Sequence, residues 1–281
     1  MHLLPKRIHR RSIPLILLLG ILFVVGEAIS AEKARNTLRI LCYNIHYGQG
    51  NDGVYDIPRL ARVIKETKPD IVALQEVDVV VKRSGRVHQL RELARLTGLQ
   101  GRYGPTQHYQ GGLYGNGILT RLPILDVEIQ PLPYTEATEE KVTYPRAAIA
   151  LTLRAPDGQV FRVISTHFQH AQFEEDRIAE AEAINKLFAG EDDDIPTILA
   201  GDMNARPGSQ PMEILHKKWT NTMSKDEAPS SPSKSPKSRI DYILYRPASS
   251  FRLIESKVID ERMASDHLPV FAILELKASK P

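Results

Sequence analysis

The amino-acid sequence predicts an α/β fold in which two mainly antiparallel β-sheets pack together with helices on the outside. Helical patterns occur among short, strand-like apolar runs along the chain. The runs at residues 146–153 and 160–166 are joined by a tight turn, Ala-Pro-Asp-Gly at residues 155–158, so these two strands are predicted to be antiparallel. Adjacent antiparallel strands mixed with helices favour two packed sheets over a doubly wound parallel sheet.

Three helices are predicted from periodicity and end signals. The first, residues 58–67, begins after Asp56, and the second, residues 87–99, ends at Gly98. The third spans residues 173–188. Its apolar residues recur at helical spacing: Ile178, Ala181, Ile184 and Leu187.

Strands are predicted at short apolar runs bounded by turn-forming residues. They are residues 38–44, 70–75, 117–120, 124–132, 146–153, 160–166, 197–200, 240–245, 253–259 and 270–276. The segment 220–238 is rich in Ser, Pro and Lys without apolar periodicity, so it is predicted to be an exposed loop. We interpret it as a solvated connector, with a basic loop that contacts substrate as the alternative.

The positive charge of the sequence comes entirely from its first 30 residues. The 281 residues contain 37 Lys and Arg against 34 Asp and Glu, which gives a formal charge of +3. Residues 1–30 hold four basic residues and one acidic residue, so the remainder holds 33 of each and has no net charge. A balanced charge gives no support for binding a polyanion such as nucleic acid.

The N-terminal segment has the order of a secretory signal. Basic residues come first, residues 13–25 are almost wholly apolar, and small residues alternate up to Ala31. Because the apolar run is shorter than the ~20 residues of a spanning helix, we expect residues 1–30 to be a cleaved signal peptide. A retained anchor, which would give peripheral membrane contact, is the alternative. Residues 31–281 are then expected to form one exported domain, periplasmic or extracellular.

Composition excludes several classes of protein. The single cysteine, Cys42, rules out an intramolecular disulfide and a cysteine-rich zinc module, and it lies in an apolar run where we expect it to be buried. With 42% hydrophobic and 25% charged residues, the chain has the composition of a globular protein and not of a disordered one.

Polar residues recur at the ends of the predicted strands. They are Asn44, Glu76, His167, Asp202 and Asn204 after strands, and Asp266 and His267 just before the last strand. A single acid after a strand is most often a turn or helix cap, and a single histidine is most often structural. Carboxylates, amides and imidazoles gathered at strand ends, however, make a site for a hard cation and an anionic substrate. Their joint occurrence favours this second interpretation.

The order of these residues resembles the endonuclease/exonuclease/phosphatase family, which includes DNase I-like nucleases, neutral sphingomyelinases and inositol-polyphosphate 5-phosphatases. The matching segments are Tyr-Asn-Ile-His at 43–46, Leu-Gln-Glu-Val at 74–77, Gly-Asn-Gly-Ile-Leu at 115–119, Ser-Thr-His-Phe at 165–168, Gly-Asp-Met-Asn at 201–204, Arg-Ile-Asp-Tyr-Ile at 239–243 and Ser-Asp-His-Leu-Pro-Val at 265–270. They span almost the whole chain after residue 37. The resemblance implies a four-layer α/β sandwich, which agrees with the strand pattern, and makes residues 31–281 the family's catalytic domain.

The resemblance also implies a metal site. Glu76 would be the principal ligand of Mg²⁺ or Mn²⁺, and Asn44 and Asp266 would complete the shell directly or through water. Oxygen ligands with retained water suit Mg²⁺, which offsets developing charge on a phosphate. Asp202 would orient or deprotonate the attacking water, and Asn204 would hold a phosphoryl oxygen.

Two imidazoles complete the implied catalytic set. His267 with Asp241 is similar to the family's His–Asp pair, in which the carboxylate fixes the tautomer of the imidazole and raises its basicity. His167 would be the second imidazole. The sequence leaves open which histidine is the general acid and which is the general base.

Four further residues are candidates for binding the substrate phosphate. They are Arg83, Asn116, Arg146 and His170, which lie in or beside segments that resemble the family. A guanidinium near the cleft suits bidentate binding of phosphate, although Arg146 has a structural ion pair as its alternative role. His46 also flanks a matched motif.

These observations predict a Mg²⁺- or Mn²⁺-dependent hydrolase of phosphoester bonds, a phosphodiesterase or phosphatase. The balanced charge and a weaker resemblance to GPI-anchor lipid remodelers and sphingomyelinase-like enzymes favour a lipid or small-molecule phosphoester. No obligate protein partner is evident.

Three other functions are alternatives to this prediction. A secreted DNase I-like endonuclease would share every motif. An inactive binding module of the same fold would be expected to have lost Glu76, Asp202, Asp241 or His267, yet all four are present. A zinc metallophosphoesterase would carry Gly-Asn-His, where this chain has Gly-Asn-Gly at residues 115–117.

Overall fold

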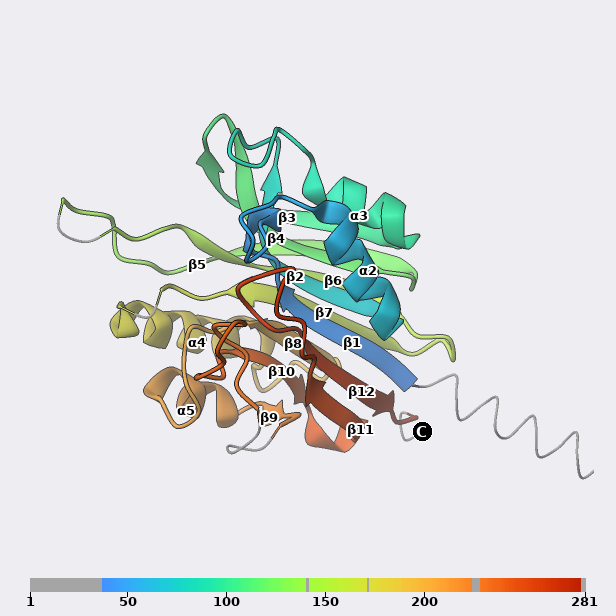
Figure 1. Cartoon of the computed structure of the whole chain (residues 1–281). Coiled ribbons are helices and arrows are strands. Elements are labelled where there is room, and N and C mark those ends of the chain that lie inside the picture. The colour runs from blue at the N-terminus through green and yellow to red at the C-terminus, as the bar shows by residue number, and fades with distance from the viewer. Residues whose placement is uncertain (1–36, 140–141, 171, 224–227, 279–281) are drawn as a thin grey trace, which may run out of the picture. The chain divides into compact units, whose positions relative to one another are not determined.

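Two six-stranded sheets lie face to face in the computed structural model, and each has helices on its outer side (Figure 1). The structure describes residues 37–139, 142–170, 172–223 and 228–278. The predicted signal peptide, residues 1–30, lies outside these ranges. Among the described residues, none of the helices combines the length and apolarity needed to cross a membrane.

The first sheet has the strand order β11-β12-β1-β2-β4-β3. Its strands are β1 (Thr37–Asn44), β2 (Ile71–Val79), β3 (Gln100–Tyr109), β4 (Gly112–Thr120), β11 (Phe251–Val258) and β12 (Val270–Leu276). All neighbouring strands are antiparallel except β1 and β2, which are parallel.

The second sheet has the order β5-β6-β7-β8-β10-β9. Its strands are β5 (Ile124–Leu132), β6 (Arg146–Arg154), β7 (Val160–His167), β8 (Thr197–Asp202), β9 (Thr220–Asn221) and β10 (Asp241–Arg246). Here β7 and β8 form the parallel pair and the other neighbours are antiparallel. The prediction of two packed, mainly antiparallel sheets is therefore confirmed.

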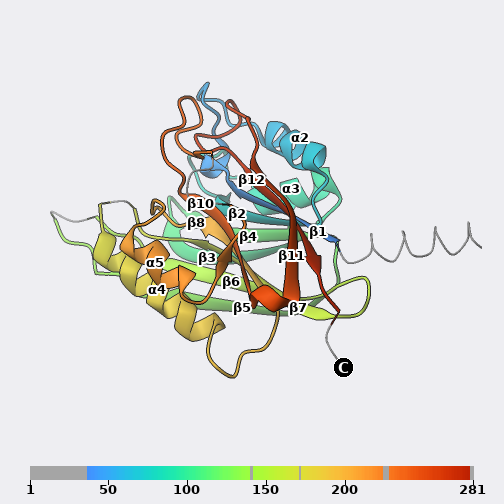
Figure 2. The same ribbon diagram turned by 90° about the horizontal axis from the view of Figure 1, so that it is seen from below.

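In the described part of the chain, four α-helices cover the outer faces of the sheets. They are α2 (Ile57–Thr67), α3 (Gln89–Thr97), α4 (Glu174–Phe188) and α5 (Gln210–His216), and two short 3₁₀ helices are η1 (His46–Gly48) and η2 (Ala248–Ser250). Helices α2 and α3 lie on one side of the paired sheets, and α4 and α5 on the other (Figures 1 and 2). This is the four-layer sandwich that the family resemblance implied.

Local signals explain where the two helices on the first sheet begin and end. Asp56 is the N-cap of α2, and its carboxylate accepts a hydrogen bond from the backbone N–H of Arg59. Gly98 ends α3 in the left-handed conformation, at φ +73°, which glycine adopts without a steric penalty.

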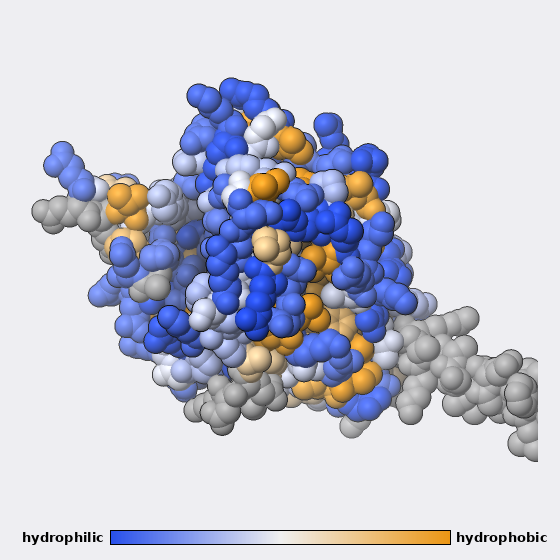
Figure 3. Space-filling view, in the orientation of Figure 1, coloured by the Kyte–Doolittle hydropathy of each residue, from blue (hydrophilic) through white to orange (hydrophobic). Residues whose placement is uncertain are grey.

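Three apolar cores separate the four layers. The central core lies between the sheets and includes Leu38, Ile40 and Cys42 of β1, so the prediction that Cys42 is buried is confirmed. Alternate residues of the same strand, Leu41 and Tyr43, face the core under α2 and α3, as the two-residue period of a strand requires. A third core lies under α4 and α5. On the face seen in Figure 3, hydrophobic residues form separate spots among hydrophilic ones.

Several elements differ from the sequence-based prediction. β3, β9 and α5 were not predicted, and the helix expected at 87–99 begins only at Gln89. In α4 the buried face includes Glu180, whereas Leu187, predicted on the apolar face, is 39% exposed. The buried face of α4 thus combines Ala181 and Ile184, as predicted, with the polar side chain of Glu180, which apolar spacing does not detect.

The prediction that residues 220–238 form a solvated connector is also partly wrong. Within its described part, Ser230 and Ser233 are fully buried. Each hydroxyl is satisfied by a hydrogen bond, from Ser230 to the Asp241 carboxylate and from Ser233 to the Ser265 carbonyl. Small hydroxyl side chains can be buried when they are hydrogen-bonded, so a Ser-rich composition did not reveal this packing.

Gly201 provides a test of how closely β7 and β8 are paired. A Cβ atom added at Gly201 would lie 2.3 Å from the Thr166 carbonyl oxygen on β7. We expect Gly201→Ala to lower the free energy of unfolding by about 1–3 kcal/mol, the usual effect of overpacking. Gly190→Ala is the matched control, because a Cβ there has no neighbour within 4 Å. Urea denaturation measures both, and equal effects would contradict the register of the parallel pair.

Candidate active site

A cavity of about 500 Å³ opens where the carboxyl ends of the parallel strand pairs meet. Six residues predicted to act in metal binding or catalysis line it: Glu76, His167, Asp202, Asn204, Asp266 and His267. Three predicted phosphate-binding residues line it as well: Arg83, Arg146 and His170. Asn44 and Asp241 lie just behind the lining, in hydrogen-bond contact with Glu76 and His267 respectively.

The backbone of β2 is distorted where it presents Glu76. A bulge between Leu74 and Val77 interrupts the pairing with β4, and Glu76 has the left-handed φ of +60°. That conformation costs about 1–2 kcal/mol for a residue with a Cβ. It separates two adjacent side chains: Gln75 is buried between the sheets and donates to Ser165, while Glu76 lines the cavity.

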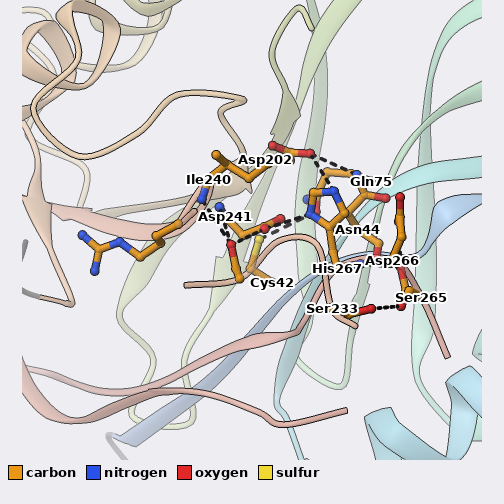
Figure 4. Close-up of polar contacts among 12 residues, drawn as sticks. Cys42, Asn44, Gln75, Asp202, Ser233, Ile240, Asp241, Ser265, Asp266 and His267 are labelled. Atoms are coloured by element: carbon orange, nitrogen blue, oxygen red, sulfur yellow. Dashed lines mark hydrogen bonds and ion pairs between the residues drawn. The ribbon is translucent and has the colours of Figure 1, made fainter. Parts of the chain in front are cut away.

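The carboxylate of Asp202 is buried, and it lies beside Asn44 and His267 (Figure 4). One of its oxygens accepts a hydrogen bond from the Asn44 amide at 3.1 Å, and the other accepts one from the backbone N–H of Asn204 at 2.9 Å. The Nε2 atoms of His167 and His267 lie 3.5 and 3.8 Å from the first oxygen. Burial, together with the nearby charge of Asp241, raises the pKa of Asp202 to about 7.

His267 is held by a buried hydrogen-bond chain. Its Nδ1 lies 2.9 Å from the Asp241 carboxylate, and the hydroxyl of Ser230 donates to the same carboxylate oxygen at 2.6 Å. Burial alone would lower the pKa of His267, but the carboxylates of Asp241 and Asp202 outweigh it and raise the pKa well above its usual range. The implied His–Asp pair is therefore present in the geometry, with a serine that the sequence did not reveal.

His167 has the opposite electrostatic environment. Burial and the positive charge of Arg146 lower the pKa of His167 well below its usual range. Its Nε2 lies 3.1 Å from the amide nitrogen of Asn204, which also donates to the Phe168 carbonyl. If that nitrogen donates in both contacts, Nε2 of His167 is unprotonated. The two imidazoles beside Asp202 thus differ in protonation, an arrangement typical of acid and base pairs.

The rest of the predicted metal shell lies beside this centre. The amide of Asn44 donates to Glu76 at 3.1 Å as well as to Asp202, and its carbonyl oxygen accepts from the backbone N–H of His46 at 3.0 Å. Asp266 has its carboxylate 3.8 Å from the His46 ring. Several carboxylates therefore face one cavity, and oxygen-rich donor sets of this kind fit Mg²⁺ or Mn²⁺.

A second grouping of ligand atoms overlaps the first. Among the described residues, Asp202, Asp241 and His267 each place one ligand atom within 4.8 Å of the others. The Nδ1 atom of His267 is already engaged by Asp241, which favours a hydrogen-bonded pair at this position.

The predicted phosphate-binding residues differ in their placement. Arg146 is buried at the cavity, and its Nε has no hydrogen-bond partner among the described residues. His170 lines the cavity from the loop after β7. Asn116 is buried away from the lining, and its amide donates to the Ala147 carbonyl at 2.9 Å, a contact that ties the two sheets together. Arg83 lines the cavity but is paired with Asp78.

Sequence reasoning did not find the neutral part of the lining. It includes Gln107, Tyr109, Tyr114 and Tyr144. Tyr109 and Gln107 lie on β3, a strand that lacks an apolar run, and none of the four ends a predicted strand. Their spacing of two along β3 is the only signal that could have placed Gln107 and Tyr109 on one face.

A buried acid on α4 fixes the loop that follows His167 and carries His170. The carboxylate of Glu180 accepts a hydrogen bond from the backbone N–H of Gln169 at 2.8 Å, and the Arg177 guanidinium donates to the His170 carbonyl at 2.6 Å. Glu180 is fully buried, and this burial raises its pKa to about 8.

The comparisons with known proteins agree with this geometry. Residues 41–267 match the model of the Endonuclease/Exonuclease/phosphatase family. The chain belongs to this family. It is 26% identical over 259 residues to YbhP of Escherichia coli strain K12, covering 85% of this chain and 97% of YbhP.

Solved structures that are similar to this chain have the same fold. An endonuclease/exonuclease/phosphatase from Beutenbergia cavernae has a TM-score of 0.66 at 26% identity, covering 86% of this chain and 72% of that one. A mannosyl-6-phosphatase from Bacteroides thetaiotaomicron has a TM-score of 0.68 at 20% identity, covering 84% of this chain and 99% of that one. The expected fold and the membership of the hydrolase family are thereby confirmed.

The raised pKa of Glu180 predicts how the stability of the protein changes with pH. Its pKa in the folded protein, about 8, exceeds the ordinary 4.5, so the folded state keeps a proton that the unfolded state loses. The Glu180 contribution to stability is therefore present below about pH 4.5 and is lost as the pH rises to 8. We expect Glu180→Gln to be more stable than the wild type by about 2–4 kcal/mol at pH 8, with little difference at pH 4.5.

Urea denaturation of both proteins at the two pH values provides the measurement. Glu182→Gln is the matched control, since Glu182 is exposed on the same helix. If the gain in the free energy of unfolding from Glu180→Gln is the same at pH 4.5 and pH 8, burial does not shift the pKa of this carboxyl group.

Proposed function

We propose that this family member is a divalent-metal-dependent hydrolase of a lipid or small-molecule phosphoester. One observation carries the proposal: the buried carboxylate of Asp202 lies within 4 Å of two imidazoles, His167 and His267, in an acid-lined cavity. Water activation and phosphoryl-group stabilisation need such groups side by side.

The charge of the cavity supports a metal requirement. Glu76, Asp202 and Asp266 all line it, while the nearby Arg83 is already neutralised by Asp78. An anionic phosphoester would be repelled by these carboxylates unless a cation were bound among them. Glu76 and Asp266 would hold Mg²⁺ or Mn²⁺, with the Asn44 amide positioning the Glu76 carboxylate. The cation would supply Lewis-acid polarisation of the phosphoryl group.

The residues of the chain then have distinct tasks. Asp202 orients the attacking water and accepts its proton, and the amide of Asn204 holds a phosphoryl oxygen. His267, kept protonated by Asp241, and Arg146 stabilise negative charge on the phosphoryl group. Water adds its oxygen to phosphorus and gives a proton to Asp202, and the P–O ester bond breaks. The leaving alkoxide takes a proton from His267, which regains one from Asp202, 3.8 Å from its Nε2.

The balanced charge of the chain after residue 30 favours a small or lipid-borne substrate over a nucleic acid. A mannosyl-6-phosphatase with the same fold is consistent with a small phosphoester as substrate. We also propose that residues 1–30 direct export, on the basis of their basic, apolar and small-residue order.

Activity should depend on metal and on two residues from different parts of the site. We expect Mg²⁺- or Mn²⁺-dependent hydrolysis of bis-p-nitrophenyl phosphate, with Glu76→Ala and His267→Ala each lowering kcat by about 10²–10⁴-fold. Glu66→Ala and His108→Ala are controls, because both residues are exposed and outside the cavity lining. Wild-type turnover that persists in excess EDTA would refute the metal requirement.

Nucleic acid should not be the preferred substrate. At about 0.15 M salt, where charge attraction is screened beyond roughly 8 Å, we expect nicking of supercoiled plasmid to be slower than hydrolysis of at least one phospholipid or small phosphoester. Gel densitometry and phosphate release provide the two rates. Faster cleavage of plasmid than of every other phosphoester would favour the endonuclease alternative.

A further inference from the structure

One wall of the cavity is built from an arginine and neutral side chains. Arg83, Gln107, Tyr109 and Tyr114 line the cavity on this side, and we call these four residues the Arg83 wall. The Arg83 guanidinium carbon lies 4.7 Å from the Tyr109 ring centroid and 5.3 Å from that of Tyr114. Behind it, the ring of Tyr47 stacks at 3.7 Å. Four planar groups are thus packed together beside Glu76.

The charge of Arg83 is already neutralised. Its Nε and Nη2 atoms each donate to one carboxylate oxygen of Asp78 at 2.9 Å, and the Asp78 side chain is completely buried. A bidentate pair of this kind has no net charge as a unit. It leaves Nη1 and one hydrogen of Nη2 free to donate hydrogen bonds in fixed directions. Arg83 is therefore poorly suited to the phosphate-clamp role that the sequence suggested, and better suited to neutral acceptors such as hydroxyl groups.

The wall is held in place by buried contacts. The amide of Gln89 accepts from the backbone N–H of Asp78 at 2.9 Å and donates to the Tyr47 carbonyl at 2.5 Å, so one side chain fixes both partners of Arg83. Tyr47 itself has the left-handed φ of +43°, which is rare for a residue with a Cβ. Binding groups fixed in this way lose little entropy when a ligand binds.

The turn between β3 and β4 is fixed to the same loop. The backbone N–H of Arg83 donates to the Gln110 side chain at 3.0 Å. A Cβ added at Gly112 would lie 2.5 Å from the Val79 carbonyl oxygen, so the two backbones approach as closely as a glycine permits. The loop that carries Arg83 and the hairpin that carries Gln107 and Tyr109 are therefore tied together by a hydrogen bond and a close backbone contact.

We propose that the Arg83 wall binds the alcohol part of the substrate, and that this alcohol is a hydroxyl-bearing ring, a sugar or a cyclitol. The donors of Arg83 and the amide of Gln107 would bond the ring hydroxyls, while the tyrosine rings would pack against its C–H face. A cavity of about 500 Å³ has room for one phosphorylated ring. This inference rests on the proposed function, because it assumes hydrolysis beside Glu76.

Two other substrate groups fit this wall less well. A cationic headgroup is attracted to an aromatic face, but it accepts no hydrogen bond, so the donors of Arg83 and Gln107 would lose water without gaining a partner. It would also face the guanidinium that lies against Tyr109 and Tyr114. A ring that carries further phosphates would need unpaired cations, and Arg83 is paired with Asp78. A neutral polyhydroxylated ring uses both the aromatic surface and the remaining donors.

The test compares phosphomonoesters that differ only in the alcohol. Hydrolysis with Mg²⁺ or Mn²⁺ is measured as phosphate release from glucose 6-phosphate, mannose 6-phosphate, myo-inositol 1-phosphate, cyclohexyl phosphate, phosphocholine and adenosine 5′-monophosphate. We expect the wild type to have at least about a tenfold higher kcat/KM for one of the three polyol esters than for cyclohexyl phosphate, because a site built for hydroxyl groups rejects an analogue that lacks them.

Two variants test the wall itself. Gln107→Ala and Arg83→Lys should each lower kcat/KM for the preferred polyol ester by about tenfold or more, with less than a threefold change for cyclohexyl phosphate. Gln100→Ala, an exposed glutamine on the same strand, and Arg86→Lys, an exposed arginine on the same loop, are the matched controls. The side chain of Gln107 makes no hydrogen bond within the described residues that would be lost, so its variant remains informative if Arg83→Lys does not fold.

The outcomes separate this inference from the proposed function. Equal losses on every substrate would overturn it, since they would show that Arg83 only braces the loop. Wild-type preference for phosphocholine, the adenosine ester or cyclohexyl phosphate would overturn it as well. Absence of metal-dependent hydrolysis of all these esters and of bis-p-nitrophenyl phosphate would instead refute the proposed function.

Discussion

The side-chain amide of Asn44 joins the two halves of the active site. Its nitrogen donates to Glu76 of its own sheet and to Asp202 of the facing sheet, both at 3.1 Å. The Asn44 carbonyl oxygen accepts from the backbone N–H of His46, which fixes the orientation of the amide, and its backbone carbonyl accepts from Ser265. An amide has two donor hydrogens, so one side chain can satisfy two carboxylates without bringing a charge. The spacing of the acids across the sheets therefore depends on this residue.

The topology explains why these residues meet. Each sheet contains a single parallel pair, β1 with β2 and β7 with β8, and each pair is connected through a helix. Carboxyl ends of parallel strands lie at the same edge of a sheet, whereas those of antiparallel neighbours lie at opposite edges. Asn44 and Glu76 come from the first pair, and His167 and Asp202 from the second. The antiparallel strand β10 adds Asp241 from its first residue, which pairs in register with Asp202.

The sequence predicted the parts of this arrangement that follow from apolar patterning. Strands with buried runs were recognisable because a polar residue interrupts each run at its end, as at Glu76 and Asp202. β3 was not, because Gln100–Tyr109 is exposed along much of its length and contains Gly and Pro. Asn116 was expected at the substrate, yet its amide is used between the sheets. Ser230 supports the His267–Asp241 pair from a segment whose composition is typical of loops. Hydrogen bonds between distant segments carry no periodic signal, and these are the contacts that sequence reasoning missed.

Electrostatics links the site to its surroundings in a way that net charge does not show. The chain after residue 30 has no net charge, but its charged residues are unevenly distributed. Asp202 and Asp241 are buried in the site, and the basic residues Arg83 and Arg146 lie around them. Arg83 is neutralised by Asp78, and the charge of Arg146 acts on His167 by lowering its pKa. The acids that line the cavity, Glu76, Asp202 and Asp266, outnumber the two lining cations that are not neutralised by Asp78, Arg146 and the protonated His267. Because buried charges are stable only when they are compensated, this excess of acids supports the proposed metal cation. The pairing of Arg83 with Asp78, in contrast, leaves the Arg83 wall without net charge, which suits the proposed neutral ring.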